Sequence, residues 1–293
     1  MLLLALVAGE HVGSIEFFGY KGIDVARVRE ALPVREGGEF TGETIEQVRQ
    51  AVIQATGKAP TDIAAPCCVN GNHILFIGLP GASNRQFVYN APPSGDERLP
   101  PYIMDLHRRF LDALLVAVRK GTAQEDRSKG YSLVEDPTVR SIQRSIRRWA
   151  VKHEREVFQA LERSSDAEHR QVASLAAGYA RQSPEQIRAL VRAARDPNDT
   201  VRNNATRALG VLVASKASLA AQIEPEAFID MLNSGAWTDR NKALMLLAEL
   251  TAGRDPNLLA RIRSRALDAL AEMAAWHGGY ERDAQAILER VRQ

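Results

Sequence analysis

Histidine is the side chain that most often serves as a metal ligand or as a general base near neutral pH. The chain has six histidines, and they are scattered over positions 11, 73, 107, 153, 169 and 277. His153-Glu154 begins like a zinc-binding helix, but Val157 stands where the second histidine would have to face the metal. No phosphate-binding loop, dinucleotide fingerprint, nucleophile elbow or CxxC pair occurs. We therefore expect no catalytic, cofactor-binding or metal-ligating residues, no small-molecule substrate and no enzymatic activity.

The composition is that of an ordinary globular protein. The chain has 293 residues, of which 45% are hydrophobic and 25% are charged, which excludes disordered and disulfide-dense classes. The 38 Lys and Arg residues against 36 Asp and Glu residues leave a net charge of +2. This balance is too even for a protein whose whole surface grips nucleic acid.

The first residues have the character of a targeting segment. Residues 1–9, MLLLALVAG, match the apolar centre of a secretory signal, with Ala8 and Gly9 before Glu10 as a cleavage site. Neither this stretch nor any later window reaches the length of about 20 residues that spans a bilayer. We expect residues 1–9 to be the remnant of a signal that targets the N-terminus to the membrane. We also expect the protein to be exported to the periplasm or cell envelope. The alternative is a folded first strand in a cytoplasmic protein.

The two cysteines, Cys67 and Cys68, are adjacent. Neighbours in a strand point to opposite faces, so these side chains cannot easily bond to each other. We expect two separate thiols and no disulfide framework.

Residues 10–90 have the pattern of a small α+β domain. Apolar residues that alternate with polar ones predict strands, and apolar residues three and four apart predict helices. Ile15 and Phe17 alternate with Ser14 and Glu16, which predicts a first strand with one exposed face. The predicted elements begin with a strand that ends at Gly19 and a helix over 25–32. A second helix follows, capped by Thr41 and ending at Gly57. Two strands over 61–69 and 73–79 then flank the turn Asn70-Gly71.

This order β-α-α-β-β, with Gly37, Phe40 and Thr41 before the second helix, resembles the POTRA domain. The resemblance implies a small mixed sheet with two helices on one face, in an exported bacterial protein that binds other polypeptides. It also places strand 61–69 at the sheet edge, where backbone groups could pair with a partner's strand near Ile63 and Ala65. The alternative is a plain α+β domain whose edge is protected.

Residues 91–148 form a predicted helical connector. It contains one helix after Tyr102 and the start of another at Asp136-Pro137, an N-cap followed by proline. The second helix carries Arg140, Arg144, Arg147 and Arg148 on one side. Arg144 and Arg148 are candidate partner contacts, although a solvated face paired with nearby glutamates explains such a stripe equally.

Residues 149–293 are helical throughout, and they repeat. The template Arg-x-x-Ala recurs at Ala173, Ala205 and Ala243, and a weaker copy at Ala284 has Glu in place of Arg. The alanines are 32, 38 and 41 residues apart, and this spacing with two helices per unit predicts an all-α solenoid.

The copy from Asp196 to Ala205, D-P-x-x-x-V-R-x-x-A, closely resembles the HEAT repeat. The resemblance implies that Arg170, Arg202 and Arg240 form an internal ladder with aspartates of adjacent units. It also implies a groove that suits a peptide or a protein surface. Asn203, Asn204 and Arg207 are the candidate groove residues, with a solvated helix face as the alternative.

We therefore predict a non-enzymatic adaptor with a POTRA-like domain (10–90), a connector (91–148) and a HEAT-like solenoid (149–293). Its partners would be proteins or peptides in a bacterial envelope or secretion assembly. The alternative is an intracellular HEAT-repeat protein that binds nucleic acid through the basic helix and groove, as HEAT-like DNA glycosylases do. The balanced charge makes nucleic acid the weaker expectation.

Overall fold

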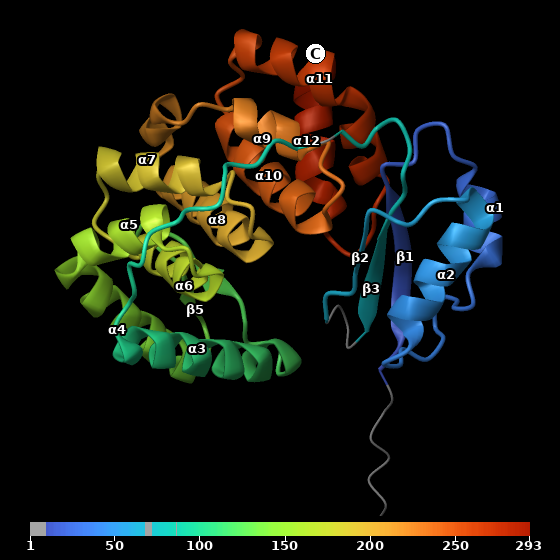
Figure 1. Cartoon of the computed structure of the whole chain (residues 1–293). Helices are drawn as coiled ribbons and strands as arrows, with labels where there is room; N and C mark the ends of the chain where they lie inside the picture. The colour runs from blue at the N-terminus through green and yellow to red at the C-terminus, as the bar shows by residue number, and fades with distance from the viewer. Residues whose placement is uncertain (1–9, 68–71, 86) are drawn as a thin grey trace, which may run out of the picture. The chain divides into compact units, whose positions relative to one another are not determined.

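The computed structural model describes residues 10–67, 72–85 and 87–293 (Figure 1). It divides into two compact units. The first comprises the residues up to Arg85, with Gly235–Trp237 and Asp268–Gln285, and the second comprises Gln86–Ser234, Thr238–Leu267 and Ala286–Gln293. This division differs from the predicted boundaries, because the segment 91–148 belongs to the helical unit and two short segments of the repeats belong to the unit that holds the sheet. The predicted signal segment 1–9 and the turn Asn70-Gly71 lie outside the described residues.

The first unit is built on a small mixed sheet. Its elements are β1 (Val12–Phe18), α1 (Val25–Ala31), α2 (Thr44–Thr56), β2 (Asp62–Ala64) and β3 (His73–Gly78). The strand order is β1-β3-β2, with β1 parallel and β2 antiparallel to β3. The predicted element order is confirmed, and β2 lies at the edge. The strand predicted over 61–69 is shorter than expected.

The second helix begins and ends where local backbone chemistry allows it. Gly57 ends α2 with φ of 72°, a left-handed conformation that glycine adopts at little cost. The prediction that Thr41 caps this helix is wrong, because the N-cap position is held by Glu43. Its hydroxyl accepts from Glu43 N at 3.3 Å, and the helix starts at Thr44.

Both faces of the sheet are covered, which corrects the prediction of a half-exposed first strand. One face packs on α1 and α2 through residues such as Ile15, Phe17 and Ile77. On the other face Phe76 contacts Trp237, Trp276 and Tyr280, with ring centroids 4.9, 4.9 and 5.3 Å away. The two tryptophans therefore serve as packing residues.

Two glutamates lie buried on this second face. Glu16, predicted to be exposed, is 5% exposed, and its Oε1 lies 3.0 Å from His277 Nδ1. Glu272 accepts hydrogen bonds from the backbone N–H groups of Gly19 (2.7 Å) and Tyr20 (3.0 Å) and from the Ser83 hydroxyl. These contacts connect segments more than 180 residues apart in the chain, so sequence periodicity could not predict them.

The remaining elements are helices and one small hairpin, and the helices form consecutive pairs. They are α3 (Pro101–Arg119), β4 (Glu125–Asp126), β5 (Leu133–Val134), α4 (Pro137–Lys152), α5 (Glu154–Arg163), α6 (Ala167–Ala177), α7 (Pro184–Ala193), α8 (Asp199–Ser215), η1 (Ala217–Gln222), α9 (Glu226–Met231), α10 (Trp237–Leu250), α11 (Pro256–Ala274) and α12 (Glu281–Arg292). Helix α5 packs on α6 and α7 on α8, while α5 contacts α7 and α6 contacts α8. The first and second helices of these pairs thus form two layers.

Polar caps begin several of these helices. Asp136 accepts from the N–H groups of Thr138 and Val139, which confirms the predicted N-cap before Pro137. Helix α8 begins two residues later than its Asp-Pro pair suggests, because Asn198 is its N-cap and accepts from Val201 N. Asp196 is therefore available for a different role.

The repeated alanines mark the points where helices pack closely. Ala173, Ala205, Ala243 and Ala284 are all 0% exposed. Gly210 on α8 is equally constrained, since a Cβ there would lie 2.7 Å from Met245 Cε on α10. Small residues at these positions let neighbouring helices approach, as the template predicted.

His107 on α3 should make the protein less stable in mild acid. Burial lowers the pKa of its imidazole, against an opposing effect of the Glu168 carboxylate. The unfolded chain takes up a proton near pH 6.5 that the folded chain resists, so stability falls as the pH drops through that value. We expect His107→Gln to reduce the loss of Tm between about pH 7.5 and 5.5. Equal losses in thermal unfolding of both proteins would contradict this assignment.

Two further observations concern the cysteines and the length of the helices. Cys67 is disulfide-bonded, which differs from the expected separate thiols; Cys68 lies outside the described residues. Within 10–67, 72–85 and 87–293, no helix is both long and apolar enough to cross a membrane.

Candidate functional site

Buried arginine–aspartate pairs join the helix pairs of the second unit. Arg170 on α6 donates to Asp196 through Nε (2.8 Å) and Nη2 (3.1 Å). Arg202 on α8 donates to Asp239 on α10 in the same way, at 2.8 and 3.2 Å. Each arginine also reaches the carbonyl six residues before it, Ser164 O or Asp196 O, at 2.9 Å. These bidentate pairs confirm the predicted ladder for Arg170 and Arg202, so the two arginines are structural.

The third arginine follows the same rule with one change. Arg240 is 0% exposed, and its Nε donates to Ser234 O, again six residues earlier, at 2.7 Å. The position of the acidic partner differs between the repeats. Arg170 pairs with Asp196 in the loop before α8, whereas Arg202 pairs with Asp239 on α10 itself. The loop position that corresponds to Asp196 is held by Ser234. Ser234 Oγ donates to Asp239 Oδ2 at 2.8 Å and so holds this carboxylate in place.

The predicted groove residues on α8 are engaged within the chain. Asn204 Nδ2 donates to Gln171 O (3.3 Å) and Ser174 Oγ (3.2 Å) on α6, and Asn203 donates to Asn204 Oδ1 at 3.4 Å. Arg207 forms an ion pair with Glu125 and donates to Ser132 Oγ at 3.1 Å. Their role in binding a partner stays a prediction, but Arg207 now lies under another part of the protein.

That part is the segment between α3 and α4, residues 121–136, which we call the α3–α4 loop. It contains the two-residue strands β4 and β5, paired at Glu125↔Val134 and Asp126↔Leu133. Tyr131 of the loop lies 4.0 Å below the Arg147 guanidinium and 6.1 Å from the Tyr179 ring. The loop thus covers the α6–α8 face where the sequence predicted an open groove.

The predicted basic stripe on α4 divides into structural and exposed arginines. Arg140 Nε donates to Val134 O at 2.7 Å, and Arg147 Nη1 donates to Tyr179 O at 2.7 Å. Arg144 and Arg148 are exposed, and the latter contacts only Ser145 Oγ among the described residues, at 2.9 Å. Two of the four predicted cations therefore remain for a partner.

The candidate residues at the sheet edge are Ile63 and Ala65. Both side chains pack partly buried against the core of the first unit. Ile63 pairs with Ile77 on β3. Any partner at this edge would have to recognise the backbone, as the predicted strand pairing requires.

Residues 87–99 form an extended segment, the strap, that the sequence did not single out. Asn90 N donates to Arg195 O (2.7 Å), and Gly95 exchanges hydrogen bonds with Arg163 O and Ser165 N, both at 2.8 Å. Tyr89 lies 4.4 Å under the Arg202 guanidinium. Figure 1 shows the strap crossing the turns of the α5–α6 and α7–α8 pairs. Its only sequence signal was the run of prolines, which excludes helix but does not predict what the segment packs on.

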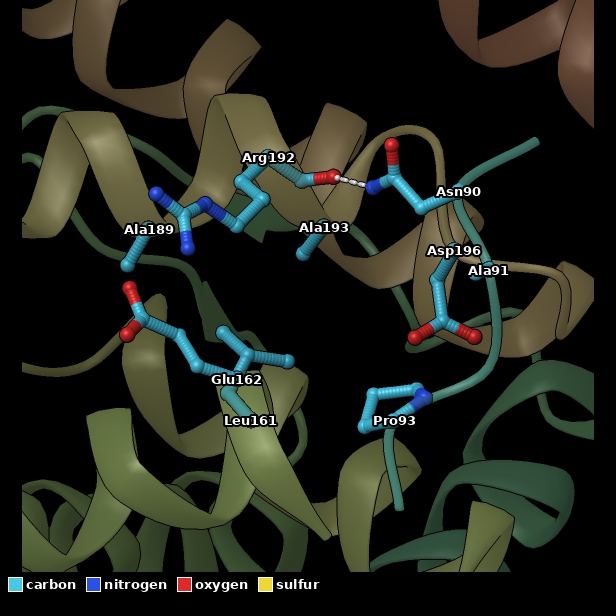
Figure 2. Close-up of a pocket in the computed structure, with 9 residues that line it drawn as sticks. All are labelled: Asn90, Ala91, Pro93, Leu161, Glu162, Ala189, Arg192, Ala193 and Asp196. Carbon is cyan, nitrogen blue, oxygen red and sulfur yellow. Dashed lines mark hydrogen bonds between the residues drawn. The ribbon is translucent and has the colours of Figure 1, made fainter. Parts of the chain in front are cut away.

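A cavity of about 380 Å³ lies between the strap and the ends of α5 and α7. Figure 2 shows Glu162 and Arg192 on one side of it and Asp196 and Pro93 on the other. Asn90 Nδ2 closes its upper rim by donating to Arg192 O at 3.0 Å. The carboxylate of Asp196 already accepts two hydrogen bonds from Arg170. No cluster of three or more metal-ligating side chains occurs among the residues with described positions.

Asn90→Ala should loosen the strap without unfolding the helices. The change removes one side-chain hydrogen bond, worth about 1 kcal/mol. We expect faster amide exchange at residues 88–95 and a small decrease in Tm. Ser94→Ala, which changes an exposed strap residue, is the matched control. Unchanged exchange in the Asn90 variant would mean that other contacts hold the strap.

Comparison with known proteins identifies the central helices. A family model described as HEAT repeats matches residues 154–248, which span α5 to most of α10. These residues are therefore similar to HEAT repeats. The match confirms the predicted repeats over this range, and it does not reach residues 10–90, so the POTRA resemblance is not confirmed.

Two solved structures are similar at a low level. A designed armadillo repeat protein is 15% identical with a TM-score of 0.42, and the match covers 64% of this chain and 91% of that one. An engineered protein is 18% identical with a TM-score of 0.41, covering 65% of this chain and 88% of that one. No curated protein sequence matches at a significant level.

Proposed function

We propose that this chain is a non-enzymatic scaffold that binds polypeptide partners through its HEAT-repeat unit. The observation that carries the proposal is the internal arginine ladder. Arg170, Arg202 and the repeated alanines make contacts inside the array, so this ladder does not use the outer side chains. Arrays of this kind present extended surfaces, which suit peptides and protein faces better than small substrates.

The nucleic-acid alternative receives less support. Duplex binding depends on many free cations, because each phosphate contact neutralises one charge. Arg140 and Arg147 donate to backbone carbonyls, and the chain's net charge is only +2. Arg144 and Arg148 remain the residues on which this alternative depends.

The experiment is affinity purification of the tagged full chain after cross-linking in cells of its source organism. We expect one or a few proteins to be enriched at least tenfold over a mock sample and to bind the purified chain again. Nuclease treatment should leave this enrichment unchanged. Loss of all partners after nuclease treatment would favour nucleic acid, and no enrichment at all would sink the scaffold proposal.

An envelope setting is part of the proposal. It is supported by the apolar residues 1–9 and by nothing in the folded units. Cell fractionation, with sequencing of the mature N-terminus, tests it. Recovery of the uncleaved chain in the cytoplasmic fraction would contradict it.

A further inference from the structure

We propose that the α3–α4 loop is a built-in ligand, which occupies a peptide-binding site on α6 and α8. The partner that fits this site is an extended polypeptide with a carboxylate and, six residues later, an aromatic ring, as in Glu125 and Tyr131. This inference rests on the proposed function and names the site and the chemistry of its partner.

The first argument is the position of Arg207. Among the described residues its side chain has two partners, Glu125 and Ser132, and both belong to the loop. Burial lowers the pKa of its guanidinium to about 10, so the group still carries its charge at neutral pH. The helices thus supply a half-buried cation with no counter-ion of their own. A carboxylate must come from outside α6 and α8, and here it comes from the loop.

The second argument is a seat for an aromatic ring. Arg147, fixed by its hydrogen bonds to Tyr179 O and Ala180 O, lies over the Tyr131 ring at 4.0 Å. A guanidinium over a ring attracts its electron-rich face. The carbonyls that hold Arg147 in place do not belong to the loop. The guanidinium would therefore keep its position, and could bind another aromatic ring, without Tyr131.

The third argument is that the loop fills its site incompletely. A cavity of about 20 Å³ remains beneath it, lined by Tyr179, Asn204 and Arg207 among others. Tyr179 is 2% exposed, and its hydroxyl makes no hydrogen bond of ordinary geometry among the described residues, although the Gln143 side chain lies beside it. An unpaired buried hydroxyl costs free energy. A ligand with one more polar group at this point would bind better than the loop does.

The loop can leave the site by opening the short ladder between β4 and β5 while β5 stays in place. Leu133 and Val134 are buried, and Val134 N donates to Gln143 Oε1 at 2.7 Å. The tip from Arg127 to Gly130 is joined to β5 by a ladder of two residue pairs, and Gly130 lies close to Ser215 at the end of α8. The contacts of Glu125 and Tyr131 add to these restraints, so their removal should loosen the loop.

The test uses a fluorescent synthetic peptide with the sequence of residues 123–133, AQEDRSKGYSL. We would measure its binding by anisotropy to the full chain and to the full-length double variant Glu125→Ala and Tyr131→Ala. We expect binding to the double variant to be at least tenfold tighter than to the unchanged chain, because the competing loop is weakened. Adding Arg207→Ala should abolish the gain. Lys129→Ala, an exposed tip residue, is the matched control and should bind like the unchanged chain.

Tight binding of a peptide with its Glu and Tyr replaced by Gln and Ala would overturn the proposal. So would the absence of binding to a double variant that retains its helical circular dichroism and exchanges its loop amides rapidly. If the double variant does not fold, Glu125→Gln serves in its place with the same expected order. Failure of the peptide test would leave partner capture by another surface intact, so the two proposals fail separately.

Discussion

Asp239→Ala should lower the free energy of unfolding by about 3–5 kcal/mol, the largest effect we expect from a single polar side chain. The substitution leaves the guanidinium of Arg202, only 3% exposed, without the carboxylate that receives two of its hydrogen bonds. It also removes the acceptor of the Ser234 hydroxyl. A buried charge that loses its partner cannot be rehydrated without opening the interface between α8 and α10. Urea unfolding, followed by circular dichroism, measures the change.

The matched control is Arg181→Ala. Arg181 pairs with Glu154 at 3.1 Å, but its side chain is 65% exposed. Exposed pairs contribute about 0–1 kcal/mol, so this variant should unfold almost like the unchanged protein. The double change Arg202→Met and Asp239→Leu should recover most of the lost stability, because it removes both buried charges together. Equal effects of Asp239→Ala and Arg181→Ala would show that the ladder does not stabilise the array.

Glu272→Ala should destabilise the sheet unit by about 3 kcal/mol, since hydrogen bonds to a charged group contribute about 1.5–3 kcal/mol each. The carboxylate, 4% exposed, receives the N–H groups of Gly19 and Tyr20. Without it, two backbone donors at the end of β1 would be buried with their acceptor removed. Amide exchange at residues 19 and 20 should rise along with the fall in unfolding free energy.

Asp268→Ala on the same helix provides the comparison. Asp268 binds Lys21 at 2.6 Å, but both side chains are more than half exposed. We expect a loss below about 1 kcal/mol and little change in exchange at residues 19 and 20. If both variants behave alike, the contacts of Glu272 with the β1 end are not what holds these segments together.

The sequence predicted the helix pairs well because their determinants are local. Asp136-Pro137 begins α4 through a cap and a proline at adjacent positions. The buried alanines recur at the spacing of the repeat, and the Arg-Ala template places both residues on known sides of one helix. The HEAT-repeat match over 154–248 confirms this part of the prediction.

The candidate site was predicted less well. Arg207 was identified as a groove residue, but no local signal connects it with Glu125, 82 positions earlier, or with the loop that covers it. Ile63 lies in the edge strand β2 and Ala65 follows the end of this strand, and both side chains pack against the core. Nothing near Asn90 indicated that the strap would bind the ends of two repeat helices.

The sequence by itself determined which residues form helices and which small side chains lie between them, since periodicity within a few turns decides both. That Arg170, Arg202 and Arg240 face inward was implied by the resemblance to the HEAT repeat. Only the tertiary structure decided what covers the surfaces that these elements leave. The second face of the sheet receives residues 235–237 and 268–285, and the α6–α8 face receives the α3–α4 loop. Such pairings depend on shape and charge between segments far apart in the chain, and no local pattern of residues records them.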